Sequence, residues 1–166
     1  MTNPSNSSTA SPPAPAAPVI TKSEVTWRGE RAFDAGPTGR QHRIEAGGPS
    51  APGPVEALLG AVATCSSLDV IDILAKRRTP VERLNVSVVA ERRPEHPRRV
   101  TRLDLTFCID GAGIEREHAE RAIQLSFERY CSVAASLASD IAVTAALTLN
   151  GESHPPIRMS VWKPGA

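Results

Sequence analysis

Three cysteines, Cys65, Cys108 and Cys131, offer the most reactive side chains in this sequence of 166 residues. Their number is odd and none of them has Cys-x-x-Cys spacing, so we expect free thiols in a cytoplasmic protein. A cysteine reacts as its thiolate, and a thiolate is favoured by a nearby positive charge or by hydrogen-bond donors. The surroundings of each cysteine therefore decide its chemistry.

Cys65 lies within a long apolar segment, where a cysteine most often packs as a small inert side chain. It is more than two helical turns from the expected start of that helix, beyond the useful range of the helix dipole. Asp69, four residues further on, disfavours a thiolate at Cys65. A reactive Cys65 therefore requires a cation supplied from elsewhere in the fold.

Cys131 has a more favourable local setting. It precedes a short predicted helix within residues 132–139, which Ser132 caps and whose unpaired N–H groups stabilise an anion. The alternative is that Cys131 is another packed thiol. Cys108 lies on the strand face opposite Phe107 and Ile109, so we expect a structural or incidental role for it.

The remaining patterns argue against other kinds of chemistry. The four histidines lack the spacing of a zinc site, no glycine-rich phosphate loop follows a predicted strand, and no Gly-x-Ser-x-Gly motif occurs. We therefore expect no metal and no cofactor. The formal net charge is +1, and the arginine-rich stretch 92–102 lacks interleaved aromatic residues, which predicts a solvated hairpin and no nucleic-acid partner.

One helix must position Cys65, and the sequence predicts it over residues 54–78. Pro54 suits the first turn, Glu56 complements the positive end of the helix dipole, and the basic residues 76–78 complement the negative end. Apolar side chains cover nearly the whole circumference, which predicts burial inside the subunit or in a dimer. Asp69 and Asp72 interrupt the apolar run, so we expect no membrane-spanning segment.

The rest of the chain predicts strands around this helix. Residues 1–20 are rich in Pro, Ser and Ala, which predicts a disordered tail before a domain over 21–150 and a C-terminal extension over 151–166. Alternation and turn signals predict strands over 23–35, 40–46, 84–88, 100–109 and 141–149, a second helix over 114–129, and an edge strand within 157–162. This order is typical of an α+β fold.

These residues together resemble the OsmC/Ohr superfamily of thiol peroxidases, in its less characterised YhfA-like branch. The resemblance rests on the stretch from Gly53 to Cys65, on the Ser-x-Leu-Asp-Val-Ile-Asp-Ile-Leu stretch that follows, on residues 91–93 and on residues 122–133. It covers the chain from about Glu24 to Leu149. The resemblance implies a long buried central helix wrapped by antiparallel sheets, in an intertwined homodimer.

The same resemblance implies a two-cysteine peroxidase of oxidative stress defence. The Cys65 thiolate would attack the O–O bond of an organic hydroperoxide, the sulfenic acid would condense with Cys131, and a dithiol such as a lipoylated protein would reduce the disulfide. Well-characterised members use an arginine near the N-terminal strands to stabilise the first thiolate. Arg28 and Arg31 are the candidates here, and Arg31 is preferred on spacing.

Glu56 would take the place of the glutamate that orients this arginine in the family. It is nine residues before Cys65, which puts it roughly 180° around an ideal helix from that cysteine. Two other functions fit the same fold. One is a non-catalytic carrier of a small hydrophobic ligand, and the other is a redox sensor that signals through a Cys65–Cys131 disulfide.

Overall fold

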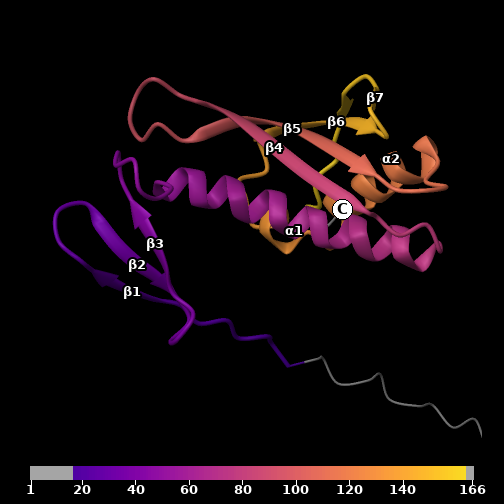
Figure 1. The fold of residues 1–166 in the computed structure, drawn as a ribbon. Helices are drawn as coiled ribbons and strands as arrows, with labels where there is room; N and C mark the ends of the chain where they lie inside the picture. The colour runs from indigo at the N-terminus through magenta and orange to yellow at the C-terminus, as the bar shows by residue number, and fades with distance from the viewer. Residues whose placement is uncertain (1–16, 164–166) are drawn as a thin grey trace, which may run out of the picture.

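The computed structural model describes residues 17–163, so most of the predicted tail lies outside the described residues. The fold combines two sheets with one long helix and a shorter helical segment (Figure 1). The elements in chain order are β1 (Glu24–Trp27), β2 (Ala32–Gly36), β3 (His42–Glu45), α1 (Pro54–Lys76), β4 (Arg83–Arg92), β5 (Val100–Asp110), α2 (Arg116–Leu125), the π-helix η1 (Ser126–Tyr130), α3 (Ser132–Ala135), β6 (Ala142–Leu149), β7 (Glu152–Ser153) and β8 (Ile157–Arg158). This arrangement confirms the α+β class.

The N-terminal sheet is an antiparallel meander in the order β1-β2-β3. The prediction of one strand over residues 23–35 is wrong, because the chain reverses direction between β1 and β2. Gly29 and Glu30 turn it with positive φ angles of 101° and 46°, a backbone conformation that the alternation of side chains does not reveal. The sheet extends away from the N-terminal end of α1 (Figure 1).

The second sheet has the order β4-β5-β6-β7, and β8 also pairs with β6. β4 and β5 form an antiparallel hairpin, but β5 and β6 run parallel, which the expectation of antiparallel sheets did not include. The parallel pair arises because α2, η1 and α3 carry the chain back between the two strands. β8 lies at the place of the predicted edge strand and is two residues long.

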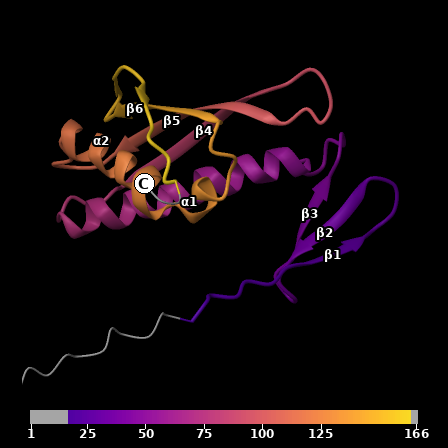
Figure 2. The same cartoon turned by 180° about the vertical axis from the view of Figure 1, so that it is seen from behind.

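One face of this sheet forms the core. Every second residue is buried against the helices from position 103 of β5 and from position 143 of β6, and the alternating set is Leu103, Leu105, Phe107, Ile109, Val143, Ala145, Leu147 and Leu149. α1 contacts β4 and α2 contacts β6, and the two helices also contact each other. Seen from behind, α2 lies beside β6 with α1 below it (Figure 2). Cys108 is on the opposite face and exposed, as predicted.

The start of α1 follows the sequence signals. Pro54 occupies the first turn, and the Glu56 carboxylate accepts a hydrogen bond of 2.7 Å from the Gly53 N–H, which is the half of a capping box that a glycine N-cap allows. The predicted start is correct, and the helix ends two residues before the predicted end.

Burial of α1 within the chain is one-sided. A single stripe of residues on the inner face is fully buried, comprising Val62, Ser66, Val70 and Leu74. On the remaining surface, Leu58, Leu68 and Ile71 are 39%, 60% and 38% exposed. Burial inside the subunit, one of the two predicted alternatives, is therefore incomplete, and burial in a dimer stays a prediction. Partly buried residues flank this stripe, and the side of α1 that carries Leu58, Leu68 and Ile71 is exposed within residues 17–163.

By length and composition alone, α1 is apolar enough to cross a membrane. The core helix of a soluble domain meets the same criteria. The inner stripe of α1 packs on β4, α2 and η1, and a polar contact from η1 reaches Asp69 on the same helix. This packing favours a core helix, in line with the prediction made from Asp69 and Asp72.

Candidate active site

Two cysteines and one carboxylate meet where α1 passes the crossover segment. Cys65 and Asp69 come from the middle of α1, and Cys131 is the residue between η1 and α3. The two sulfurs and a carboxylate oxygen all lie within 4.8 Å of one another. The structure therefore brings together two residues that are far apart in sequence, and it adds a third that the sequence analysis treated only as an unfavourable charge.

The local backbone explains how each side chain reaches the cluster. Residues four apart on a helix share one face, so Cys65 and Asp69 point the same way from α1. The π-helix η1 ends with a hydrogen bond of 2.8 Å from the Cys131 N–H to the Ser126 carbonyl, five residues back. Single π-turns of this kind insert one extra residue and are frequent at functional sites. Here the turn aims Ser126 and Cys131 at the same point on α1.

Cys131 is almost fully buried, with 1% of its surface exposed. Burial raises the pKa of its thiol from the ordinary value of 9.0 to about 12. The Ala134 N–H donates to the sulfur at 3.4 Å and opposes this rise, while Cys65 and Asp69 add to it. Cys131 is the N-cap of α3, a place predicted for Ser132, and the stabilising N–H donor is present. Its effect is outweighed by desolvation, so Cys131 is a thiol at neutral pH.

Cys65 is partly exposed and faces Ser132, whose hydroxyl oxygen is 4.0 Å from its sulfur. Among residues 17–163, no arginine or lysine side chain forms a hydrogen bond with Cys65. The described part of this chain therefore supplies no cation that is hydrogen-bonded to Cys65.

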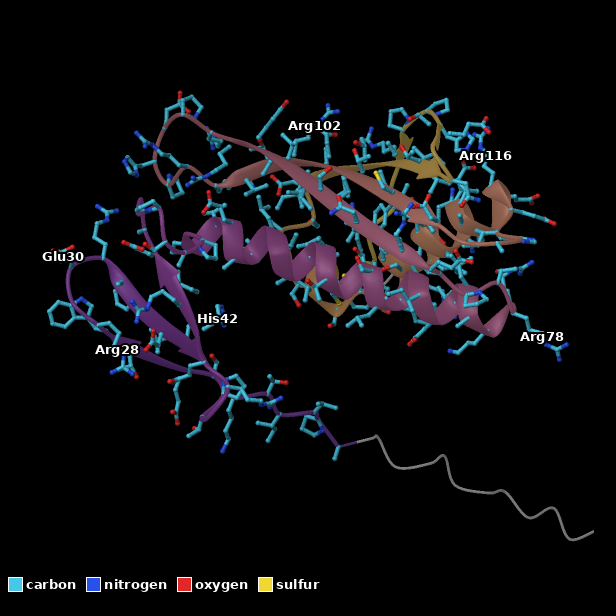
Figure 3. All side chains as sticks on the ribbon, in the orientation of Figure 1. Arg28, Glu30, His42, Arg78, Arg102 and Arg116 are labelled. Carbon is cyan, nitrogen blue, oxygen red and sulfur yellow. The ribbon has the colours of Figure 1, made fainter. Side chains whose placement is uncertain are left out.

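Both candidate arginines belong to the N-terminal sheet. Arg28 lies on the far side of that sheet from α1 (Figure 3), where its Nε donates to Asp34 at 2.6 Å. Arg43 donates to the same carboxylate, and Arg43 and Arg28 together hold the pKa of Asp34 below its usual range. Arg31 is exposed in the turn before β2. Neither Arg28 nor Arg31 is brought to Cys65 within one chain.

Glu56 is also kept away from the cysteines. Its carboxylate is occupied by the Gly53 N–H at the start of α1. Nine residues at 1.5 Å each separate it from Cys65 by about 13 Å along the helix axis. Inside one chain Glu56 therefore caps the helix and does not contact the reacting group.

Ser126 is a site residue that the sequence analysis missed. Its fully buried hydroxyl donates a hydrogen bond of 2.7 Å to Asp69 Oδ2 and fixes that carboxylate beside the two sulfurs. The two residues are 57 positions apart, so no local pattern connects them. The sequence offered only an indirect indication of Ser126: Cys65 and Asp69 have helical spacing, and a serine stands five residues before Cys131.

The three donor atoms are of types that zinc accepts. Two sulfurs on one tetrahedral zinc ion lie about 3.8 Å apart, given a bond length of about 2.3 Å. The atoms of this cluster lie within 4.8 Å of one another, but the fourth protein ligand of a closed structural site is absent among the described residues. The cluster is better described as a pair of thiols with a neighbouring carboxylate.

The fold and the cluster define an α+β protein with a paired-thiol centre. The chain belongs to the OsmC-like family: the family described as OsmC-like protein matches residues 47–146, a range that contains both cysteines. Protein YhfA of Escherichia coli strain K12 is 40% identical over 97 residues, covering 58% of this chain and 72% of YhfA. These matches confirm the resemblance seen in the sequence.

Solved structures show the same fold. An OsmC-like protein from Mycoplasma pneumoniae is similar with a TM-score of 0.69 and 16% identity, covering 77% of this chain and 95% of that protein. The organic hydroperoxide resistance protein OhrB of Bacillus subtilis is similar with a TM-score of 0.52 and 16% identity, covering 78% of this chain and 98% of OhrB. At these identities the two structures show the fold alone.

Proposed function

We propose that this protein is a thiol peroxidase that reduces organic hydroperoxides with Cys65 and Cys131. One observation carries the proposal: a partly exposed thiol and a buried thiol from distant parts of the chain lie within 4.8 Å of each other. The two sulfurs are therefore close enough for a modest approach to bring them to the roughly 2.05 Å of an S–S bond. Organic hydroperoxide resistance in the name of OhrB supports the same substrate class.

The reaction has two steps. The Cys65 thiolate attacks one oxygen of the peroxide, the O–O bond breaks, and the alkoxide leaves and takes a proton, so that Cys65 becomes a sulfenic acid. Cys131 then attacks the Cys65 sulfur, forms the disulfide and releases water. The partly exposed position of Cys65 admits the peroxide, whereas the buried Cys131 is shielded from the peroxide and acts in the second step. A dithiol, such as a lipoylated protein, returns both residues to thiols.

A second copy of the chain completes the site in this proposal. The apolar side of α1 that carries Leu58, Leu68 and Ile71 is unpartnered within the described residues, and a homodimer would bury it. The N-terminal sheet extends beyond the end of α1, so one copy can reach another with it (Figure 1). Arg31 of that sheet is the preferred cation for Cys65, which lacks one in its own chain. The apolar interface would admit alkyl chains and so favour organic peroxides over hydrogen peroxide.

The test is a single oxidation in a Cys108→Ser background, which removes the exposed third thiol. One equivalent of cumene hydroperoxide should produce the Cys65–Cys131 disulfide, identified by peptide mapping with mass spectrometry. Cys131→Ser should instead leave a sulfenic acid on Cys65 that dimedone labels. Protein that retains both thiols after this treatment would contradict the proposal.

A carrier of a small hydrophobic ligand is the second candidate function. It is favoured by the absence of a cation beside Cys65 in the described part of the chain and by the exposed apolar side of α1. A carrier would bind its ligand equally well after Cys65→Ser and would form no disulfide with one equivalent of peroxide. The oxidation experiment therefore separates the two functions.

A further inference from the structure

Asp69 has no role in the two steps described above, although it is the third member of the cluster. We propose that its carboxylate moves a proton between Cys131 and the leaving group on Cys65 during disulfide formation. This inference rests on the proposed function, because a peroxide would produce the oxidised Cys65 in the cell. Its chemistry, activation of Cys131 for attack on an oxidised Cys65, can be measured without any peroxide.

The carboxylate lies close to both reacting groups. Its ligand oxygen and the two sulfurs are mutually within 4.8 Å. The Ser126 hydroxyl holds Oδ2 at 2.7 Å, and no side chain among residues 17–163 forms a hydrogen bond with Oδ1. No arginine or lysine in that range forms an ion pair with Asp69 either. The carboxylate is thus oriented by one neutral donor and keeps an oxygen free to accept a proton.

Disulfide formation requires a base at this place. Cys131 is almost fully buried and carries its proton at neutral pH, yet only a thiolate attacks sulfur efficiently. Solvent has little access to the Cys131 sulfur. Asp69 is therefore the group in the cluster that can take its proton as the sulfur attacks.

The step balances in atoms and protons. Cys131 sulfur bonds to Cys65 sulfur while the S–O bond of the sulfenic acid breaks. The proton of Cys131 passes to Asp69 and from Asp69 to the departing hydroxide, which leaves as water. Asp69 ends as the carboxylate with which it began. Cys65 and Cys131 together are oxidised to the disulfide, and the oxygen that came from the peroxide is reduced to water.

The same charge has the opposite effect on the first step. A carboxylate beside Cys65 disfavours the thiolate that attacks the peroxide. Removal of the charge should therefore slow disulfide formation without slowing the initial attack. A residue with a merely structural role would not separate the two steps in this way.

Asp69→Asn is the sharpest variant, because asparagine has the same shape and its amide oxygen still accepts from Ser126. Asp72→Asn is the matched control, because Asp72 is an exposed carboxylate on the same helix. It lines the same groove as Asp69, together with Lys76 and Arg77, but it is not a member of the cluster. Ser126→Ala is the second variant, since it keeps the carboxylate and removes the hydrogen bond that orients it.

The experiment uses reduced full-length protein with Cys108→Ser and one equivalent of 5,5′-dithiobis(2-nitrobenzoate). Attack by Cys65 releases one coloured thiolate and leaves a mixed disulfide. Attack by Cys131 on the Cys65 sulfur then releases a second one, and the proton of Cys131 passes through Asp69 to water. Stopped-flow absorbance resolves the two phases, and the second phase is independent of protein concentration.

Asp69→Asn should slow the second phase by about 10²-fold, at the lower end of what a positioned general base contributes, and should not slow the first. Ser126→Ala should slow the second phase less, and Asp72→Asn should behave like the parent. A second phase that is unchanged in both Asp69→Asn and Ser126→Ala would overturn the inference. A repeat with one equivalent of cumene hydroperoxide distinguishes the peroxidase function from the role of Asp69. If the parent protein does not react with the peroxide, only the peroxidase function is refuted.

Discussion

Cys131 should resist alkylation in the native protein. The perturbation is a timed exposure of the reduced chain to iodoacetamide at neutral pH. Iodoacetamide reacts with the thiolate, and burial raises the pKa of Cys131 from 9.0 to about 12. Each pKa unit reduces the thiolate fraction tenfold, so this rise alone slows the reaction by about 10³-fold relative to an ordinary thiol. Since only 1% of the residue is exposed, restricted access slows it further.

Mass spectrometry of the peptides that contain Cys108 and Cys131 measures this prediction within one sample. Cys108 is exposed on the outer face of the sheet and serves as the internal standard. The same measurement in concentrated guanidinium should remove the difference, because the unfolded chain buries neither thiol. If the native Cys131 peptide were alkylated as fast as that of Cys108, the burial argument would be refuted, and with it the need for a base in disulfide formation.

Three further predictions follow from the same structure. The urea midpoint should fall as pH rises from 9.0 towards about 12, because in that range the unfolded protein releases the Cys131 proton while the folded protein keeps it. Cys131→Ser should make this fall with pH less steep. An identical dependence of the midpoint on pH in the variant would contradict the prediction. Leu68→Glu should convert the proposed dimer to a folded monomer, since it places a charge on the exposed apolar side of α1, and an unchanged sedimentation coefficient would argue against that interface. Glu56→Ala should lower the free energy of unfolding by about 1 kcal/mol through loss of the hydrogen bond that its carboxylate accepts from the Gly53 N–H. If the oxidation of Cys65 by cumene hydroperoxide also slowed strongly in Glu56→Ala, Glu56 would be acting beyond its cap.

Features encoded by neighbouring residues were predictable from the sequence. Pro54 and Glu56 fixed the start of α1, because caps depend on side chains within one turn. Alternation predicted which face of β5 and β6 is buried. Resemblance to a family supplied the pairing of Cys65 with Cys131, which the residues alone left open.

Features that depend on distant contacts were not predictable. The alternation of apolar and polar residues did not reveal the chain reversal at Gly29 and Glu30. The parallel pairing of β5 with β6 depends on the whole crossover between them. The buried state of Cys131 outweighed the local N–H donor that the sequence indicated, since desolvation is a property of the packed fold. The contact between Asp69 and Ser126 joins two elements that only tertiary structure brings together.

The most direct test of the central claim is the turnover of cumene hydroperoxide by the pure protein with dihydrolipoamide as reductant. Hydrogen peroxide is the comparison substrate, and Cys65→Ser is the control. Our account predicts turnover that requires Cys65 and that is faster with the organic peroxide. Absence of turnover with both oxidants, or equal turnover by Cys65→Ser, would contradict the assignment of this paired-thiol centre as a peroxidase.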